Sequence, residues 1–200
     1  MPSISSDYRT HDIETQRLLA LSNTLSGLSP IHQKLVAEIV LLRLFSLFEN
    51  LIRSVTLKLL CRAVYIDGSI PMLLTSARSS QNAFTLLKTY GRNKNHQPLW
   101  SKATDIKENL RYVINHADNI IIVVDRNSVM IDELRRVRNR IAHNNAGSRK
   151  DYRHVVRKHY GAFMNHVTPG KLLLTQRIQP PLLEQYIRQE RILVKDIVKA

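Results

Sequence analysis

The stretch LVAEIVLLRLFSLFENLIRSVTLKLL, residues 35–60, is the most apolar part of this 200-residue chain. Leu, Ile, Val and Phe recur throughout it, and scattered polar residues such as Arg43, Glu49 and Lys58 interrupt them. A helix that is apolar around most of its circumference belongs inside a protein core. The interrupting charges also keep every apolar run shorter than a membrane span. We therefore expect one long core helix over residues 31–64 at the centre of an all-α fold.

The residues on either side of this stretch predict more helices. Ser29 and Pro30 are typical of a helix start, and Gly27 is typical of a helix end. Further helices are expected at residues 7–26, 77–90, 102–117, 127–143, 149–164 and 180 to near the C-terminus. The run NIIIVVD (119–125) fits either a short strand or a buried link between helices. A short extended segment is expected near residues 171–178.

The chain has the length and composition of one domain. No internal repeat, low-complexity tract or long linker divides the sequence, so we predict a single helical domain over residues 1–200. Residues 1–28 fit either an arm that contacts a second subunit or an ordinary packed helix. Cys61 is the one cysteine, and no apolar core follows a basic start at the N-terminus, so we expect a cytoplasmic protein without a membrane segment. The sequence has neither zinc-site spacing nor a glycine-rich phosphate loop, so we expect no metal and no cofactor.

The charge of the chain is strongly positive and unevenly spread. Thirty Lys and Arg oppose sixteen Asp and Glu, which gives a formal net charge of +14. Between residues 135 and 159, nine basic residues accompany one acid, Asp151. Like charges at this density repel one another unless a partner neutralises them. Nucleic acid is therefore the partner that we expect first, ahead of an acidic protein and an anionic membrane.

The segment RRVRNRIAHNN, residues 135–145, holds residue types that are suited to cutting RNA. The planar guanidinium of Arg138 suits a phosphate. His143 can take and return a proton, because histidine has an unperturbed pKa of about 6.5. RNA supplies its own nucleophile, the 2′-hydroxyl, so a base and a cation are in principle sufficient without a metal. The products of such a reaction carry 2′,3′-cyclic phosphate and 5′-hydroxyl ends.

Helix geometry constrains how these two side chains can meet. Residues five apart lie about 140° apart around an α-helix, so Arg138 and His143 do not share a face on an unbroken helix. Asn139 and His143, four apart, do share one. Two arrangements can bring these side chains together. In one, the helix ends or bends near His143, which the sequence NNAGS (144–148) favours through the left-handed preference of Asn and Gly. In the other, a second subunit completes the site across a two-fold axis.

The stretch RNRIAH, residues 138–143, resembles the signature of HEPN domains, in which an Arg and a polar residue precede a His. The segment LFSLFENLI (44–52) is similar to the long helix of defence-associated members. The resemblance implies an HEPN-like helical bundle, a homodimer with the motifs at its interface, and a metal-independent endoribonuclease of a toxin–antitoxin or antiphage-defence system. By this resemblance, Arg138 would bind the scissile phosphate, His143 would act as acid and base, and Asn139 would orient the substrate or the histidine.

Other residues are assigned from their charge and spacing. Glu49 fits an ion pair with Arg53, four residues later in the same helix. Alternatively, Glu49 reaches the active site and contacts Arg138 or His143 without touching the substrate. Asn145 stands where a subset of the family's toxins has Tyr, so features special to that subset are not carried over. The basic residues expected to contact RNA are Arg135, Arg136, Arg140, Arg149, Lys150 and Arg153. An antitoxin or another defence-system protein is a further expected partner.

Two other functions fit the same residues. A non-catalytic module of this type would bind RNA, a nucleotide or an acidic protein through its basic face. Its salt-sensitive binding would survive the replacement of His143. A DNA-binding helix-turn-helix regulator would insert the basic helix that starts near Arg149, but the long central helix is not typical of that motif.

Overall fold

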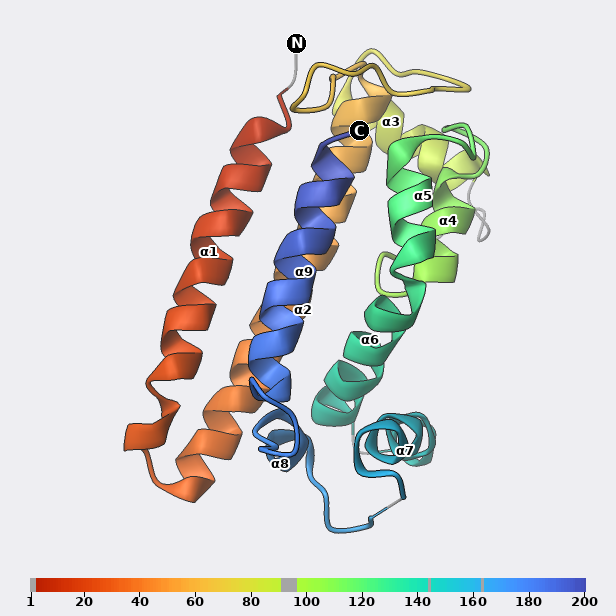
Figure 1. Ribbon diagram of the computed structural model, residues 1–200. Helices are drawn as coiled ribbons and strands as arrows, with labels where there is room; N and C mark the ends of the chain where they lie inside the picture. Colours follow the sequence, from red (N-terminus) through yellow and green to blue (C-terminus); the bar gives the residue numbers. More distant parts are fainter. Residues whose placement is uncertain (1–2, 91–96, 144, 163) are drawn as a thin grey trace. The chain divides into compact units, whose positions relative to one another are not determined.

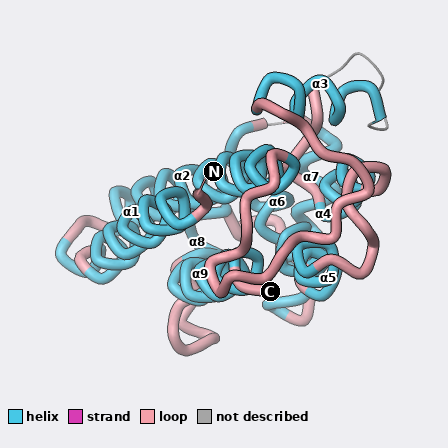
Figure 2. Tube along the Cα trace, turned by 90° about the horizontal axis from the view of Figure 1, so that it is seen from above, coloured by secondary structure: helices cyan, strands magenta, loops and turns pink. Residues whose placement is uncertain are grey.

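The computed structural model describes residues 3–90, 97–143, 145–162 and 164–200 (Figure 1). These residues are helices and connecting loops, and they contain no strand; one isolated antiparallel bridge joins Leu73 and Ile114 (Figure 2). The predicted all-α class is confirmed. The elements are α1 (Ser5–Asn23), the 3-10 helix η1 (Leu25–Gly27), α2 (Pro30–Leu60), α3 (Ser80–Tyr90), α4 (Ala103–Leu110), α5 (Asn119–Arg126), α6 (Ser128–Ala142), α7 (Ala146–Tyr160), α8 (Pro169–Leu173) and α9 (Leu182–Val198).

The chain forms two compact units, each assembled from separated segments. The first unit comprises Met1–Asp12, Phe48–Asp132 and Arg191–Ala200, and the second comprises Ile13–Leu47 and Glu133–Glu190. Helices α1, α2, α6 and α9 each contribute residues to both units. The expectation of a single domain over the whole chain stays a prediction.

The core of the first unit forms around the C-terminal half of α2, the stretch that the sequence marks as most apolar. Ile52, Val55 and Leu59 are completely buried there, in one cluster with apolar side chains of α3, α4, α5 and α9. Burial of apolar surface is the main favourable contribution to folding, so this half of α2 anchors the first unit.

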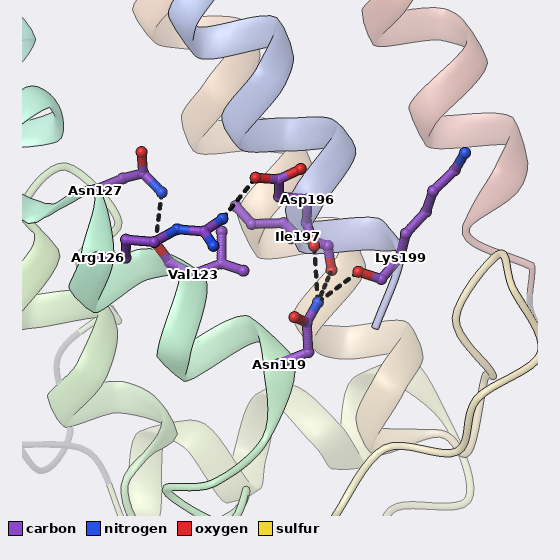
Figure 3. A network of polar contacts seen from close by, with 7 residues as sticks. All are labelled: Asn119, Val123, Arg126, Asn127, Asp196, Ile197 and Lys199. Atoms are coloured by element: carbon purple, nitrogen blue, oxygen red, sulfur yellow. Dashed lines mark hydrogen bonds and ion pairs between the residues drawn. The ribbon is translucent and has the colours of Figure 1, made fainter.

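Hydrogen bonds and an ion pair connect the C-terminal end of α9 to α5 (Figure 3). The Asn119 Nδ2 atom donates to the carbonyl oxygens of Asp196 at 2.8 Å and Lys199 at 2.9 Å. Arg126 pairs with the Asp196 carboxylate at 2.6 Å. The last carbonyls of a helix have no partner within that helix, so these donors satisfy groups that would otherwise need water.

The second unit buries apolar side chains from the N-terminal half of α2 and from α6, α7, α8 and α9. Within it, α8 approaches α2 closely. The backbone N–H of Gly170 donates to Glu38 Oε1 at 2.8 Å. A Cβ atom at Gly170 would lie 2.7 Å from the carbonyl oxygen of Lys34, so the approach requires glycine.

The structure corrects the extended segment that was expected near residues 171–178. This expectation is wrong, because Pro169–Leu173 forms helix α8 instead. The hydroxyl of Thr168 accepts the backbone N–H of Lys171 at 3.3 Å, and Pro169 occupies the first turn, where its fixed φ suits a helix. The sequence Thr-Pro-Gly is therefore a helix start rather than a plain turn.

Two other boundaries are resolved by local contacts. The run 119–125, for which a short strand and a buried link between helices were both open, is neither of these but a helix in its own right, α5. Asp118 caps this helix by accepting the backbone N–H of Ile120 at 3.2 Å. The helix expected over residues 102–117 is shorter than predicted and ends at Leu110.

Candidate functional site

Helix α6 carries the motif residues and ends immediately before His143. Its last residue is Ala142, and the His143 side chain beyond it is exposed. Arg138 and Asn139 lie in the last turns of α6, and both are half-buried. The helix therefore ends where the first of the two expected arrangements requires, while completion of the site by a second subunit stays a prediction.

The guanidinium of Arg138 is held by two contacts within the second unit. Its Nη1 atom donates to Asn139 Oδ1 at 2.9 Å. Its Cζ atom lies 5.6 Å from the centroid of the buried Phe45 ring, which α2 contributes. An aromatic face attracts a cation, and guanidinium stays charged at every physiological pH. The two contacts thus orient a permanent positive charge near the end of α6.

Backbone contacts are made by the described residues between α6 and α7, and the His143 side chain is exposed. The His143 N–H donates to the carbonyl of Asn139 at 2.9 Å, and the His143 carbonyl accepts the Ser148 hydroxyl at 2.5 Å. Asn145 caps α7 by accepting the Ser148 N–H at 2.8 Å, and its backbone is extended rather than left-handed as NNAGS predicted. Asn144 lies outside the described residues.

A basic cavity of about 220 Å³ lies at the end of α6 and along α7. It brings together three of the arginines that were expected to contact RNA. Burial, the largest cause, raises the pKa of Tyr152 well above its ordinary value, so this phenol stays neutral. Its hydroxyl donates to the Val167 carbonyl at 3.3 Å, which joins the segment after α7 to that helix. The described residues that line the cavity are Arg140, Arg149, Tyr152, Arg153, Met164, Asn165 and Val167.

The remaining residues expected at the site lie elsewhere. Arg135 is 3.9 Å from the Asp151 carboxylate, and Arg136 is half-buried on α6. Lys150 is exposed on α7, and none of these basic residues is among those that line the cavity. Glu49 belongs to the first unit, whereas the motif belongs to the second, and its proposed supporting role stays a prediction.

Sequence reasoning missed a buried carboxylate cluster next to the motif. Glu133 Oε1 accepts the Tyr186 hydroxyl at 2.6 Å and pairs with His159 Nε2 at 2.5 Å, and Glu133 Oε2 pairs with Lys158 Nζ at 2.5 Å. Burial raises the pKa of Glu133, but the hydrogen bonds from His159, Lys158 and Tyr186 outweigh it and lower the pKa to about 2. Glu133 is therefore ionised, and it joins α6 to α7 and α9.

The sequence held a signal for this cluster. Glu133 lies three residues after Met130 and four before Val137, inside the apolar stripe of α6. A charged residue on the core-facing side of a helix needs buried partners, so its position predicts a polar cluster. The identity of the partners is not encoded locally, because Tyr186 lies 53 residues away in the sequence.

In comparisons with family models, curated proteins and solved structures, nothing matches this chain. Within the described residues, no three or more His, Cys, Asp or Glu side chains are grouped so that they could hold a metal ion. Among the helices of the described chain, none is long and apolar enough to cross a membrane.

Proposed function

We propose that the protein is a metal-independent endoribonuclease that cleaves RNA through attack of the 2′-hydroxyl on the adjacent phosphate. The observation that carries the proposal is that the end of α6 presents a guanidinium held by two contacts and, five residues later, an exposed histidine. Arg138 is held by Asn139 and Phe45, and the imidazole of His143 is open to solvent just beyond α6. The resemblance of residues 138–143 to the HEPN signature supports the same assignment.

In the proposed reaction, His143 removes the proton of a ribose 2′-hydroxyl, and the O2′ atom attacks the neighbouring phosphorus. Arg138 stabilises the extra negative charge of the phosphorane that forms. The P–O5′ bond then breaks, and the 5′-oxygen leaves with a proton from a protonated histidine. A 2′,3′-cyclic phosphate remains on the upstream fragment.

A homodimer fits this chemistry, because a second histidine can serve as the acid while the first serves as the base. A two-fold axis beside the end of α6 would supply His143 of the partner subunit for the second role. The remaining parts of the proposal rest on the sequence and on the resemblance: a toxin or antiphage-defence role, an antitoxin or defence-system protein as partner, and a cytoplasmic location.

The experiment compares His143→Ala with wild type on total RNA in the presence of EDTA. His154→Ala is the matched control, because His154 is an exposed histidine on the neighbouring helix. General acid–base groups contribute about 10²–10⁴ to a rate, so His143→Ala should cleave at least about 100-fold more slowly while His154→Ala matches wild type. Equal cleavage by all three proteins, or cleavage that stops in EDTA and returns with Mg²⁺, would exclude the proposed site.

The basic cavity favours one alternative, a non-catalytic module that binds RNA or a nucleotide. Three arginines that line a single cavity supply affinity for phosphate without any proton transfer. This alternative predicts salt-dependent RNA binding that is unchanged in His143→Ala, together with no cleavage by wild type. Cleavage that depends on His143 would exclude it.

A further inference from the structure

An exposed arginine after α8 lies over an aromatic ring at the end of α7. The Cζ atom of Arg177 is 4.8 Å from the centroid of the Tyr160 ring, which belongs to the last residue of α7. Tyr160 is half-buried, and Arg177 is exposed. A guanidinium that stacks on an aromatic face can still bind a further group through its opposite face and its N–H edge.

One buried hydroxyl positions both members of this stack. The Tyr160 hydroxyl donates to Thr175 Oγ1 at 3.3 Å, and the backbone N–H of Arg177 donates to the same oxygen at 3.4 Å. Thr175 is buried, and its own N–H donates to the carbonyl of Leu172 in α8 at 3.1 Å. All of these residues belong to the second unit. The stack is therefore tied to both α7 and α8 within that unit.

The stretch of chain that contains the stack is basic and has no acidic residue. Residues 152–183 include five Lys and Arg and neither Asp nor Glu. The acids that bound this stretch have other partners. Asp151 lies 3.9 Å from Arg135, and Glu184 pairs with Arg188 at 2.6 Å. The stretch thus supplies positive charge without a counter-charge of its own.

Two arginines near the ring have no carboxylate partner among the described residues. Arg157 precedes Tyr160 by three residues, so the two side chains lie on one face of α7. Neither Arg157 nor Arg177 forms an ion pair with a described Asp or Glu, and both are exposed. Their neighbour Lys158, in contrast, pairs with Glu133. One surface therefore combines two exposed guanidinium groups with an aromatic ring.

We propose that Arg157, Tyr160 and Arg177 form a stacking surface for single-stranded RNA, separate from the proposed active site. A base stacks on the outer face of the Arg177 guanidinium, which the Tyr160 ring supports from the other side. Arg157 binds a phosphate of the same strand. An acidic peptide offers carboxylates for the N–H edges and nothing for the supported guanidinium face, so RNA uses the surface more completely.

The stacking surface lies at the opposite end of α7 from the motif. Helix α7 has 15 residues, and at about 1.5 Å per residue its ends are about 22 Å apart. At about 3.4 Å per stacked nucleotide, a strand covers this length with about six or seven nucleotides. The inference rests on the proposed function for the choice of RNA, and it deepens that function by adding a second contact for a longer substrate.

The test measures the affinity of two fluorescent dodecamers by anisotropy at physiological salt. One dodecamer carries adenine bases and is 2′-O-methylated, so that cleavage cannot occur. The other has abasic sugars on the same phosphate backbone. Loss of one stacked base weakens binding at least about fivefold. Wild type should therefore bind the adenine dodecamer at least about fivefold more tightly than the abasic dodecamer.

Matched variants locate the stacking and separate it from charge. Arg177→Lys keeps the charge and removes the planar group, so it should weaken binding of the adenine dodecamer at least about fivefold and leave the abasic dodecamer within about twofold of wild type. Arg157→Gln should weaken the binding of both dodecamers, because they share the phosphates. Arg9→Gln removes the same charge from an exposed position on α1 in the first unit, and it should leave both affinities within about twofold of wild type.

Three results would overturn the proposal. Equal binding of the two dodecamers by wild type would mean that no base is stacked. If Arg177→Lys binds the adenine dodecamer like wild type, or weakens both dodecamers equally, Arg177 is not the platform. A peptide of twelve glutamates that displaces the adenine dodecamer from wild type as well as unlabelled adenine dodecamer does would assign the surface to an acidic protein.

The outcome is independent of whether the protein cleaves RNA. Cleavage that depends on His143, together with binding that does not depend on Arg177, would overturn the stacking surface and leave the proposed nuclease intact. A base preference that is lost in Arg177→Lys, in a protein that cleaves no RNA, would support the stacking surface and count against the nuclease.

Discussion

Replacing Glu133 with Gln removes the charge from a buried carboxylate while nearly preserving its shape. The carboxylate is surrounded by donors from two helices, the Tyr186 hydroxyl at 2.6 Å and the side chains of Lys158 and His159 at 2.5 Å each. Only 7% of the Glu133 side chain and 12% of the His159 side chain are exposed, so solvent screens this pair little, whereas the Lys158 side chain is 57% exposed. The amide of Gln can accept from one of the donors, and it cannot neutralise their charge.

The size of the effect follows from the pKa. The folded protein lowers the pKa of Glu133 from 4.5 to about 2, and each unit corresponds to about 1.4 kcal/mol. A group with a lowered pKa stabilises the fold at pH values above its unfolded pKa, and this stability is lost as the pH falls toward the folded pKa. The ionised Glu133 therefore contributes about 3 kcal/mol at pH 7 and about half of that at pH 3.

The assay is urea unfolding followed by circular dichroism at a series of pH values between 3 and 7. Glu133→Gln should lower the free energy of unfolding by about 3 kcal/mol at pH 7, and the difference from wild type should shrink by about half at pH 3. Taking the difference between the two proteins cancels the titration of groups that do not interact with residue 133.

A surface variant provides the control for this measurement. Glu184→Gln breaks the ion pair with Arg188 on α9, and the Arg188 side chain is 57% exposed. Exposed pairs contribute about 0–1 kcal/mol, so this variant should stay close to wild type at every pH. A loss of stability in Glu133→Gln that is the same at pH 3 and pH 7 would refute the reasoning, since the charge would then not be its cause.

Three further substitutions test other parts of the structure. Gly170→Ala should lower the free energy of unfolding by about 1–3 kcal/mol, because the new Cβ would lie 2.7 Å from the backbone oxygen of Lys34. A urea titration identical to that of wild type would contradict the close approach of α8 and α2. Asn119→Ala should cost about 1–2 kcal/mol, because three carbonyls at the end of α9 lose their donor, and amide hydrogen exchange should accelerate at that end specifically. Asn139→Ala should slow RNA cleavage about tenfold or more without changing the midpoint of thermal unfolding, because Arg138 loses an orienting contact. An unchanged cleavage rate would show that Asn139 has no role in the site.

The sequence predicted the helices with long apolar patterns and missed those that depend on a single cap. Residues 35–60 indicate a core helix because apolar residues cover it on most sides. The run 119–125 is too short for its periodicity to separate a strand from a helix, and Asp118 decides the outcome by capping. The pattern of residues 171–178 predicts an extended segment, whereas capping by Thr168 makes Pro169–Leu173 a short helix.

The candidate site was predictable in part. The sequence predicted the end of α6 near His143, but the expected left-handed backbone is not what Asn145 and Gly147 adopt: Asn145 is extended and caps α7, and Gly147 lies inside α7. The contact of Arg138 with Phe45 joins residues 93 positions apart (138 − 45), and no local pattern indicates it. The three-arginine cavity likewise depends on how α6, α7 and the following segment fold together.

The chemistry of the RNA ends tests the central claim most directly. Wild-type protein should be incubated with RNA in EDTA, and the new ends should be identified by their sensitivity to phosphatase and to a cyclic phosphodiesterase. The Arg138–His143 account predicts 2′,3′-cyclic phosphate and 5′-hydroxyl ends that are absent with His143→Ala. Ends with 3′-hydroxyl and 5′-phosphate groups, or cyclic phosphates that form equally with His143→Ala, would contradict it.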